Sequence, residues 1–444
     1  MSKIIGFRRG DGSLSLPLAS MLKRIVPTRL RRIFDLPSHR LRQALLPRKL
    51  LSRRIRRIVA ADVSYGRRPV LYIDLAIISS HDAGTGIQRV VRALALAISR
   101  RVPPAWDVRF VAAKRKRRYH VVDWANGASR SSADPIHAKP GDVFLGLDYS
   151  LDTLRWHRGQ LERFRRNGGS LWFLVHDLLP SQRPDWFSPN TVLRHRIWLD
   201  MLAALADGFL CNSVQTEADL VAEMDRYGLP RNDYRVSVLP MGHDINQARY
   251  EQESRDATLH DRVAALAAQP FFLKVGTLEP RKGHLDLVRA FDVLWARGVD
   301  QNLVFIGRLG WRVDALRDII LTHAEFGRRL IWMDDVDDAG LIEALRLSEG
   351  VLVASHAEGF GLPLIEALGH GKPVLARDIP VFRAHESLGV RYFPADATPE
   401  TIADEIEQWR DAIRMGAIEV RSPVVGWDES ADQLFRAISG NRRL

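Results

Sequence analysis

The sequence is nearly devoid of cysteine. Cys211 is the single cysteine among 444 residues, so an intrachain disulfide is excluded, and so is a zinc site built from several cysteine thiolates. A chain without disulfides is typical of a reducing compartment, and we expect a cytoplasmic protein. Cys211 lies at the end of the apolar run Gly208–Cys211, and we interpret it as a buried strand residue without a redox role.

Long hydrophobic runs are also missing. No stretch approaches the roughly 18 consecutive apolar residues of a membrane-spanning helix, so we expect that the chain does not cross a membrane. The segment Ser13–Leu22 makes a poor signal peptide because it is rich in serine, contains Pro17 and is followed at once by Lys23. Hydrophobic residues make up 46% and charged residues 27% of the chain, which is typical of a globular protein and excludes a mainly disordered, collagenous or coiled-coil one. The length predicts two or three domains.

Acidic residues are scarce in the first 60 residues. This segment has 16 lysines and arginines but only Asp11 and Asp35, so its net charge is +14, whereas the whole chain carries +12. The remaining residues therefore have a net charge of only −2. A nearly neutral body argues against a protein that binds nucleic acid as a whole, and we expect no nucleic-acid partner.

We define residues 1–66 as the basic arm. Its cations alternate with apolar residues, most clearly in residues 21–26 and 50–59, and prolines interrupt the pattern. Such a pattern favours short amphipathic helices on an anionic lipid surface, where each lysine or arginine contributes about 1 kcal/mol. A solvated tail is the alternative. We therefore expect residues 1–60 to hold the protein at the inner face of the plasma membrane.

From about residue 69 the pattern changes to apolar runs of four to eight residues, each followed by a turn and a helical stretch. This alternation predicts βαβ units, and near-continuous apolar strands predict parallel sheets that are covered on both faces. A polar stretch, Asn246–Asp261, interrupts the alternation and is interpreted as an interdomain linker. The predicted strands are Val70–Asp74, Val108–Ala112, Val143–Leu147, Leu171–Val175, Gly208–Cys211 and Arg235–Leu239 before the linker, and Phe271–Val275, Asn302–Ile306, Leu330–Met333, Gly350–Ala354, Pro373–Ala376 and Arg391–Phe393 after it.

The predicted fold class is therefore α/β, with two doubly wound Rossmann-like domains that face a cleft. The first domain comprises residues 67–250 and the second residues 251–420. A helical segment, residues 421–444, follows and can return to the first domain. Ligands of doubly wound sheets bind beyond the carboxyl ends of the strands, so the loops directly after strands are the candidate site.

The strongest motif is residues 350–369, which predict a strand, a glycine loop and a helix. Gly359 and Gly361 allow the backbone to approach a ligand closely, and the N–H groups at the start of the helix can bind a phosphate. Glu358 lies in the loop and Glu366 about two turns further on, so the two carboxylates can hold different parts of an elongated ligand. An isolated glycine turn would indicate only a tight turn, but the paired acids favour a binding site.

Two glutamates separated by seven residues around Gly-Phe-Gly resemble the motif of the retaining GT-B glycosyltransferases related to glycosyltransferase family 4, or glycosyl transferases group 1. The resemblance runs from about Val70 to the C-terminus. It implies the GT-B fold and a nucleotide-sugar donor. It assigns Glu358 to the sugar hydroxyls near the anomeric centre and Glu366 to the ribose hydroxyls. The backbone that faces the sugar and the diphosphate is then that of Gly359, Phe360, Gly361 and Leu362.

A second loop after a strand carries two cations, Arg281 and Lys282. Preorganised cations can stabilise the negative charge that develops on a leaving nucleotide diphosphate without a proton transfer. The resemblance assigns both residues to the diphosphate and makes Lys282 a catalytic candidate. Many family members carry an arginine where this chain has Thr277, which leaves open whether Arg281 replaces it. An Arg-Lys pair in a loop is otherwise usually solvated.

His176 and Asp177 follow the apolar strand Leu171–Val175, where the family places a histidine that faces the donor sugar. His176 is therefore a catalytic candidate that can hydrogen-bond a sugar hydroxyl or receive the proton of the acceptor, while Asp177 orients either the ring or the loop. Gly84 and Gly86 follow the first strand and resemble the family's glycine-rich N-terminal loop, which approaches the diphosphate. A flexible connection that opens the following helix is the alternative.

One pattern favours a different enzyme class. Asp335 and Asp337 match the Asp-x-Asp pattern with which GT-A transferases bind a divalent metal. A helix is predicted from about Ala339. We prefer the interpretation that Asp338 is its N-cap and that the negative charges of the other acids interact favourably with the positive end of the helix dipole. In the resembling family the backbone around Val336 lies near the nucleotide base. No metal site is therefore predicted.

These assignments predict a retaining hexosyltransferase. The resemblance implies a nucleotide diphosphate sugar as the donor, with GDP-mannose favoured because the loop of His176 and Asp177 resembles that of mannosyltransferases, and we expect the acceptor to be a saccharide or lipid-linked saccharide of the bacterial envelope. No further cofactor is expected. One alternative is a hydrolysing nucleotide-sugar 2-epimerase, which also has two Rossmann-like domains. The other is a non-enzymatic basic protein that binds nucleic acid or membranes through residues 1–60.

Overall fold

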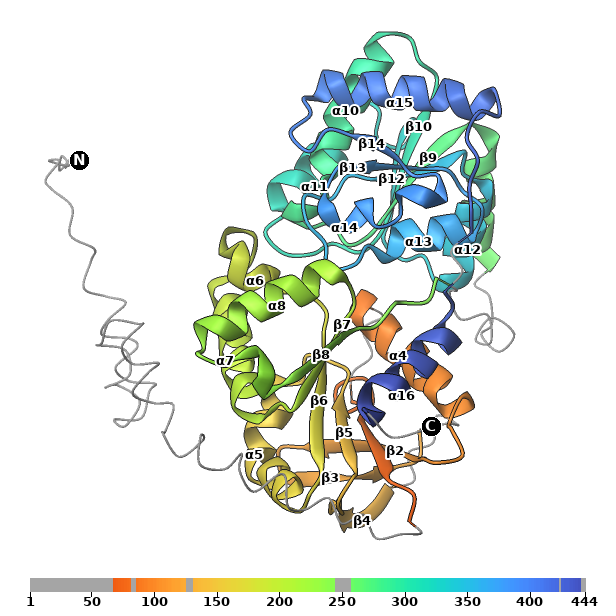
Figure 1. The fold of residues 1–444 in the computed structure, drawn as a ribbon. Helices are drawn as coiled ribbons and strands as arrows, with labels where there is room; N and C mark the ends of the chain where they lie inside the picture. The colour runs from red at the N-terminus through yellow and green to blue at the C-terminus, as the bar shows by residue number, and fades with distance from the viewer. Residues whose placement is uncertain (1–66, 81–84, 125–130, 244–256, 423–424, 441–444) are drawn as a thin grey trace, which may run out of the picture. The chain divides into compact units, whose positions relative to one another are not determined.

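The computed structural model describes residues 67–80, 85–124, 131–243, 257–422 and 425–440. The basic arm, Gly84 and most of the expected linker lie outside these residues. Residues Val63–Leu444 form one unit. Within it, Figure 1 shows two sheets with helices packed against them.

The first sheet has eight strands within the described residues, in the order β4-β3-β2-β1-β5-β6-β7-β8. From β2 to β8 every neighbouring pair is parallel. The other two pairs, β2 with β3 and β3 with β4, are antiparallel. The strands are β1 Val70–Asp74, β2 Asp107–Lys114, β3 Arg117–Val122, β4 Ser131–Pro135, β5 Val143–Gly146, β6 Ser170–Val175, β7 Gly208–Cys211 and β8 Arg235–Val238.

The antiparallel strands β3 and β4 were not predicted, and the expectation of a purely parallel sheet is wrong at this edge. The turn between β2 and β3 is Arg115–Lys116, which lies within five consecutive exposed basic residues, 114–118, and β4 contains no apolar run. An edge strand does not need the continuous apolar pattern of a strand buried on both faces. β4 is that edge strand, and β3, which pairs on both sides, begins with two exposed arginines, so neither strand shows a continuous apolar run.

The second sheet, in residues 257–422, has six parallel strands in the order β11-β10-β9-β12-β13-β14. All six were predicted to within one residue at each end. They are β9 Phe271–Val275, β10 Asn302–Ile306, β11 Leu330–Met333, β12 Gly350–Val353, β13 Val374–Arg377 and β14 Arg391–Phe393.

Helices follow most of the parallel strands, as the alternating pattern predicts. In the first part of the chain they are α4 Gly86–Arg100, α5 Leu151–Arg166, α6 Leu179–Gln182, α7 Pro189–Leu205 and α8 Val214–Arg226. In the second part they are α9 Ala257–Ala264, α10 His284–Ala296, α11 Asp314–Leu321, α12 Asp338–Leu347, α13 Leu362–Gly369, α14 Pro380–Arg383, α15 Pro399–Arg414 and α16 Trp427–Ser439.

Helix α4 illustrates how the local sequence fixes an element. The Thr85 hydroxyl accepts a hydrogen bond from the N–H of Gln88, and the Gln88 side chain accepts one from the N–H of Thr85, which is a capping box. Such a cap stabilises a helix by about 1 kcal/mol. Val90, Leu94 and Ile98 recur every four residues and are buried, so they form the face that packs on the sheet.

Both faces of each sheet are covered. In the first sheet, helices α5, α7 and α8 bury the face that carries Tyr72, Phe144 and Phe173. Helices α10 and α15 bury one face of the second sheet, including Phe272 and Phe305. The remaining faces of the two sheets belong to one continuous apolar cluster that also contains residues of α4, α12, α13 and α16.

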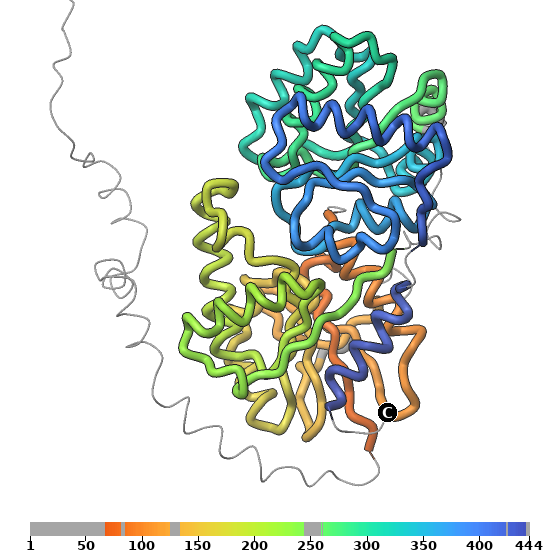
Figure 2. The backbone as a smooth tube through the Cα atoms, turned by 45° about the horizontal axis from the view of Figure 1, so that its top comes forward, coloured from red at the N-terminus to blue at the C-terminus, as the bar shows by residue number. Residues whose placement is uncertain are grey.

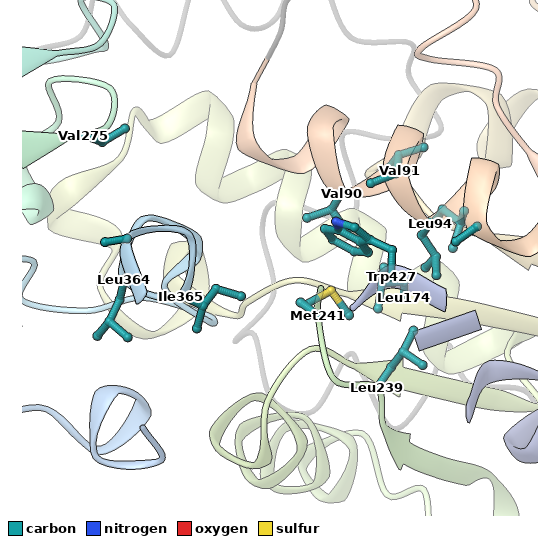
Figure 3. Close-up of a cluster of buried hydrophobic side chains, with 14 of the residues drawn as sticks. Val90, Val91, Leu94, Leu174, Leu239, Met241, Val275, Leu364, Ile365 and Trp427 are labelled. Atoms are coloured by element: carbon teal, nitrogen blue, oxygen red, sulfur yellow. The ribbon is translucent and has the colours of Figure 1, made fainter. Parts of the chain in front are cut away.

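The last helix, α16, packs against α4 of the first domain. Figure 2 shows the two helices side by side, and Figure 3 shows Trp427 beside Val90 and Leu94. The Ser430 hydroxyl donates to the carbonyl of Pro240 at 2.6 Å, which ties α16 to the segment after β8. The end of the chain therefore contributes to the core of the first domain.

In the described part of the chain, no helix combines the length and the apolar character needed to span a membrane.

Candidate active site

Three loops that follow strands carry the predicted catalytic residues. His176 follows β6, Lys282 lies in the short turn Pro280–Lys282 after β9, and Glu358 follows β12. Because these strands are parallel to their neighbours, the loops start at carboxyl ends, where ligands of doubly wound sheets bind. Strands β9 and β12 are neighbours in the second sheet, so Lys282 and Glu358 come from adjacent loops.

Glu358 lies between the two cations of the adjacent loop. Its Oε1 accepts from Lys282 Nζ at 2.5 Å, and its Oε2 accepts from Arg281 Nη1 at 2.7 Å. Each of these three side chains is largely buried, with 10 to 13% of its surface exposed. Burial by itself would raise the pKa of Glu358, but the charges of Lys282 and Arg281 outweigh it and hold this pKa well below its ordinary value. Glu358 is therefore ionised at physiological pH.

Arg281 has further partners that fix its position. Its Nε lies 2.9 Å from Glu279 Oε2, and its Nη1 donates to the carbonyl of Ala357 at 3.1 Å. Burial lowers the pKa of Arg281, but the charges of Glu358 and Glu279 outweigh this effect and raise it above its ordinary value. Whether Arg281 takes over from the arginine absent at Thr277 stays a prediction.

A third cation near this pair, Lys274, was missed in the sequence analysis. It lies within β9, and only 1% of its surface is exposed. Burial, together with the charge of Lys282, lowers the pKa of Lys274 to about 7, whereas the charge of Glu358 acts in the opposite direction. The signal was visible in the sequence, since Lys274 is the one charged residue in the apolar run Phe271–Val275.

Gly359 brings the loop of Glu358 against the first domain. A Cβ atom at this position would lie 1.9 Å from the carbonyl oxygen of His176, so a larger residue does not fit. The carbonyl of Gly359 accepts hydrogen bonds from the hydroxyls of Ser213 at 2.6 Å and Thr216 at 3.2 Å. The glycine thus permits a contact between two loops of the protein, in addition to the expected approach of a ligand.

The rest of the glycine loop leads into α13. Gly361 has a φ of +98°, which favours glycine, and it is the N-cap of α13. Gly361 has no side chain to cap the helix, Pro363 has no N–H, and the N–H of Leu364 donates to the carbonyl of Gly361 at 2.9 Å, which leaves the N–H of Leu362 for an anion. Phe360 packs edge-on against His385, and Leu362 packs against the apolar cluster.

Glu366 is buried and is paired with a residue of the first domain. Its Oε1 accepts from Arg89 Nη2 of α4 at 2.6 Å, and Arg89 Nε lies 3.8 Å from Asp338. Burial raises the pKa of Glu366, and the charge of Arg89 opposes this effect. Sequence reasoning missed Arg89 because 277 residues separate the two partners and no local pattern connects them.

The hydrogen bond of His176 defines its tautomer. Its Nε2 lies 2.8 Å from the carbonyl oxygen of Leu147, which can only accept, so Nε2 carries the proton and Nδ1 the lone pair. Burial lowers the pKa of His176, against the effects of this hydrogen bond and of Asp148, so the ring is neutral near pH 7. Asp177 was expected to orient either the ring of His176 or the loop. In the structure its Oδ1 accepts a hydrogen bond from the N–H of Leu179 at 3.1 Å, so it holds the loop.

The acids after β11 form a helix cap and an ion pair. The expectation that Asp338 is the N-cap is wrong by one residue, because α12 starts at Asp338 and Asp337 accepts from the N–H of Gly340 at 2.8 Å. Asp335 pairs with Arg262 at 2.7 Å. Among the residues that the structure describes, no group of three or more His, Cys, Asp or Glu side chains could hold a metal ion.

Two further predicted residues lie at the edges of this region. Val336 is in the loop between β11 and α12 and packs against the apolar cluster. Gly86 is the first residue of α4, and apart from its chain neighbours and the backbone of its own helix, no described atom lies within 4 Å of a Cβ built there, so the described residues leave space beside it.

The structure thus gathers part of the predicted set into one cluster, made of Glu358, Lys282 and Arg281, and brings His176 to the adjoining glycine loop. An ionised carboxylate can accept hydrogen bonds from sugar hydroxyls. Fixed cations and an uncapped helix N-terminus can stabilise an anionic group. The arrangement is therefore suited to a ligand that has both hydroxyls and phosphates.

Comparisons with known proteins identify the second half of the chain. Residues 257–412 match the family described as Glycosyl transferases group 1. The serotype-specific mannosyltransferase WbdA of Escherichia coli is 32% identical over 376 residues, which are 82% of this chain and 46% of that protein. A D-inositol 3-phosphate glycosyltransferase of Nocardia farcinica is 29% identical over 329 residues, or 66% of this chain and 70% of the relative. The chain therefore spans about half the length of the WbdA relative.

Solved structures identify the fold. The sucrose-phosphate synthase of Thermosynechococcus elongatus is similar with a TM-score of 0.56 at 18% identity, covering 83% of this chain and 98% of that one. Its likeness confirms the GT-B fold, and the GT-A interpretation of Asp335 and Asp337 does not fit it. The family resemblance predicted from Glu358 and Glu366 is likewise confirmed: the chain has the GT-B fold and carries, in residues 257–412, a domain of the glycosyl transferases group 1 family.

Proposed function

We propose that the protein is a retaining glycosyltransferase that moves a hexose, with mannose favoured, from a nucleotide diphosphate sugar to a saccharide or lipid-linked saccharide. The observation that carries the proposal is the cluster of Glu358, Lys282 and Arg281 at the carboxyl ends of β9 and β12. This cluster lies inside the glycosyl transferases group 1 match. The description of the WbdA relatives as mannosyltransferases supports GDP-mannose as the donor.

In the proposed reaction the cations act on the leaving group. Lys282 and Arg281 stabilise the charge that develops on the nucleotide diphosphate, and the N–H of Leu362 at the start of α13 adds to this effect. Glu358, which stays ionised, accepts hydrogen bonds from the donor sugar near its anomeric centre. The acceptor hydroxyl attacks from the side of the departing diphosphate, which takes up the hydroxyl proton, so the anomeric configuration is retained.

His176 contributes from the first domain. With its proton fixed on Nε2 by Leu147, the neutral ring offers Nδ1 as an acceptor for a hydroxyl of the donor sugar or of the acceptor. The backbone of Gly84 and Gly86 approaches the diphosphate from the same domain. Glu366 accepts hydrogen bonds from the ribose hydroxyls. Its carboxylate must then bind Arg89 and the ribose at the same time, or the hydrogen bond to Arg89 must break. No metal takes part in this proposal.

The proposed pathway is the synthesis of envelope polysaccharide or lipopolysaccharide. A lipid-linked acceptor would be presented at a membrane surface, and the basic arm provides the attraction to anionic lipid there. The protein then works at the inner face of the plasma membrane, with nucleotide sugar supplied from the cytoplasm. Nucleic acid has no part in this function.

A donor screen tests the proposal. The full chain is incubated with GDP-mannose, UDP-glucose, UDP-N-acetylglucosamine and dTDP-rhamnose, with and without soluble oligosaccharide acceptors, and the release of GDP, UDP or dTDP is measured. We expect release to depend on acceptor and to be largest with GDP-mannose, and the anomeric proton couplings of the product to show retention.

The same screen separates the alternatives. Stoichiometric release of nucleotide without an acceptor, together with a free 2-epimeric sugar, would identify the epimerase. Absence of release from every donor, combined with tight binding of DNA by the full chain, would support the non-enzymatic basic protein.

A further inference from the structure

An aromatic cluster lies beside the loop of Glu358. Trp186 and Phe187 belong to the segment between α6 and α7, and Trp311 lies in the loop between β10 and α11. The ring centroids of Phe187 and Trp311 are 5.7 Å apart, and the Trp186 ring lies 6.5 Å from the ring of His356, two residues before Glu358. We call Trp186, Phe187 and Trp311 the aromatic platform.

Hydrogen bonds between the two domains hold the platform together. Trp311 Nε1 donates to the carbonyl of Trp186 at 3.0 Å, and Arg312 Nη1 donates to the carbonyl of Phe187 at 3.1 Å. Arg312 has a φ of +56°, a conformation that is uncommon for residues other than glycine. Strained residues persist where their surroundings hold them, and they cluster at functional sites. The loop that carries Trp311 is therefore fixed against the first domain.

The platform combines an exposed aromatic surface with charges of both signs. Trp311 is 39% exposed, whereas Phe187 behind it is buried. The guanidinium of Arg183 stacks on Trp186 at 3.8 Å and pairs with Asp185 at 3.0 Å. Single exposed aromatic residues are common on protein surfaces, but Trp311 is held by an interdomain hydrogen bond against the partly exposed Trp186 and packs on the buried Phe187, which chance exposure does not explain.

These properties indicate the chemistry of the ligand. A purely apolar partner would remove water from the exposed pair of Arg183 and Asp185 without replacing its hydrogen bonds, and a strongly charged partner would not use the aromatic face. A pyranose ring has both an apolar face of C–H groups, which packs on an aromatic ring, and a rim of hydroxyls, which bonds to guanidinium and carboxylate groups. The aromatic platform therefore suits a neutral oligosaccharide.

We propose that the aromatic platform binds the saccharide acceptor, with Trp311 packed against a sugar ring that precedes the residue being extended. The inference rests on the proposed function and names the substrate surface of the same site. The segment of Trp186 follows the loop of His176, and the loop of Trp311 starts at the carboxyl end of β10, so the platform lies at the strand ends where the transfer site lies. An acceptor chain bound here reaches the loop of Glu358 through His356.

The test compares variants of one exposed tryptophan with a matched control. Trp311→Ala removes the ring, Trp311→Phe keeps an aromatic face but loses the hydrogen bond to Trp186, and Trp156→Ala removes another exposed tryptophan, 46% exposed on α5. Transfer from GDP-mannose to linear α-mannotriose is measured at varied acceptor and donor concentrations. We expect Trp311→Ala to raise the acceptor KM about tenfold and to affect the acceptor KM more than the donor KM, because the lost contact is made only by the acceptor.

We expect Trp311→Phe to lie close to the wild type and Trp156→Ala to match it. An unchanged acceptor KM in Trp311→Ala, or an equal rise in Trp156→Ala, would overturn the inference. Unfolding midpoints of all variants show whether any variant has lost its fold. If Trp311→Ala has, Trp311→Phe is compared with Trp311→Leu, because both lose the indole N–H but only Trp311→Phe keeps an aromatic ring. An equal acceptor KM in these two variants would then overturn the inference.

A binding measurement separates this inference from the proposed function. Titration calorimetry of α-mannotriose, isomaltotriose and chitotriose into the full chain requires no donor and no turnover. If one of these probes binds the wild type and binds Trp311→Ala about tenfold more weakly, the result supports the aromatic platform. This holds even if no donor is turned over, in which case only the proposed function fails. Absence of binding by the wild type to all three overturns the platform, even if transfer to another acceptor is found.

Discussion

Arg89 of α4 donates to Glu366 of α13 at 2.6 Å, so a residue of the first domain occupies the carboxylate that the proposed function assigns to the ribose. Both side chains are largely buried, with 25% of Arg89 and 7% of Glu366 exposed. The pair therefore links the two domains at the position where a nucleotide is expected to bind. If Glu366 binds the ribose as proposed, we expect nucleotide binding and domain contact to be coupled through this one carboxylate.

A double-mutant cycle tests this coupling. Arg89→Met leaves the buried Glu366 without its cation and should reduce the free energy of unfolding by about 1–3 kcal/mol, while the double variant Arg89→Met with Glu366→Gln should recover part of the loss. Urea denaturation of the four proteins gives the interaction energy. Arg101→Met, which breaks an exposed pair with Asp432, is the control and should have little effect. Strict additivity of the two changes would show that the pair contributes nothing.

Removal of the proposed site residues should impair transfer without unfolding the protein. We expect Lys282→Ala and Glu366→Ala each to lower the transfer rate by about 10²-fold to 10³-fold, the usual loss for one preorganised electrostatic contact. Lys116→Ala, in the exposed turn before β3, is the matched control and should retain the wild-type rate. Near-wild-type rates in both site variants would refute the site assignment.

Transfer should survive chelation. Asp335 is paired with Arg262 and Asp337 caps α12, so both carboxylates already have structural roles. We expect full activity in EDTA, measured as nucleotide release with acceptor present. Loss of turnover in EDTA and its recovery on addition of Mn²⁺ would instead establish an essential metal.

The basic arm should bind anionic membranes. The charge of +14 on residues 1–60 and the alternating apolar residues there predict that binding to phosphatidylglycerol vesicles falls with added salt and largely disappears when residues 1–60 are deleted, because salt screens the electrostatic part only. Sedimentation with vesicles measures this, and transfer to a soluble acceptor should persist in the deletion variant. Equal sedimentation of both proteins would contradict the membrane role, and tighter binding of the arm to DNA than to vesicles would favour the nucleic-acid alternative.

Lys274 should make the stability depend on pH. Its pKa is lowered from 10.5 in the unfolded chain to about 7 in the fold, so between these values the unfolded state binds more protons and stability rises with pH, by at most about 1.4 kcal/mol per unit. Urea denaturation at pH 7 and pH 9 should show this rise in the wild type and a smaller one in Lys274→Met. Lys372, whose pKa is also lowered, is present in both proteins and cancels in the comparison. Equal slopes for the two proteins would mean that Lys274 titrates normally.

The parallel strands of both sheets could be predicted from the sequence because a strand buried on both faces needs a continuous apolar run, which the pattern displays directly. The same local logic located Glu358, Glu366, Arg281 and Lys282, since glycine loops and cations directly after strands mark the ligand edge of such sheets. The hairpin of β3 and β4 could not be predicted. β4 is the edge strand and contains no apolar run, and β3 begins with two exposed arginines before its buried Tyr119 and Val122.

The sequence by itself determined the fold class, the family motif and the loops of the candidate site, because each depends on residues that are close together in the chain. Only the tertiary structure decided which side chains meet: Arg89 with Glu366, Glu358 with its two cations, and Trp311 with Phe187. The first pair joins two helices of different domains, and the last pair joins two loops of different domains. Their partners are chosen by the packing of the two sheets and of α16, which no local pattern encodes.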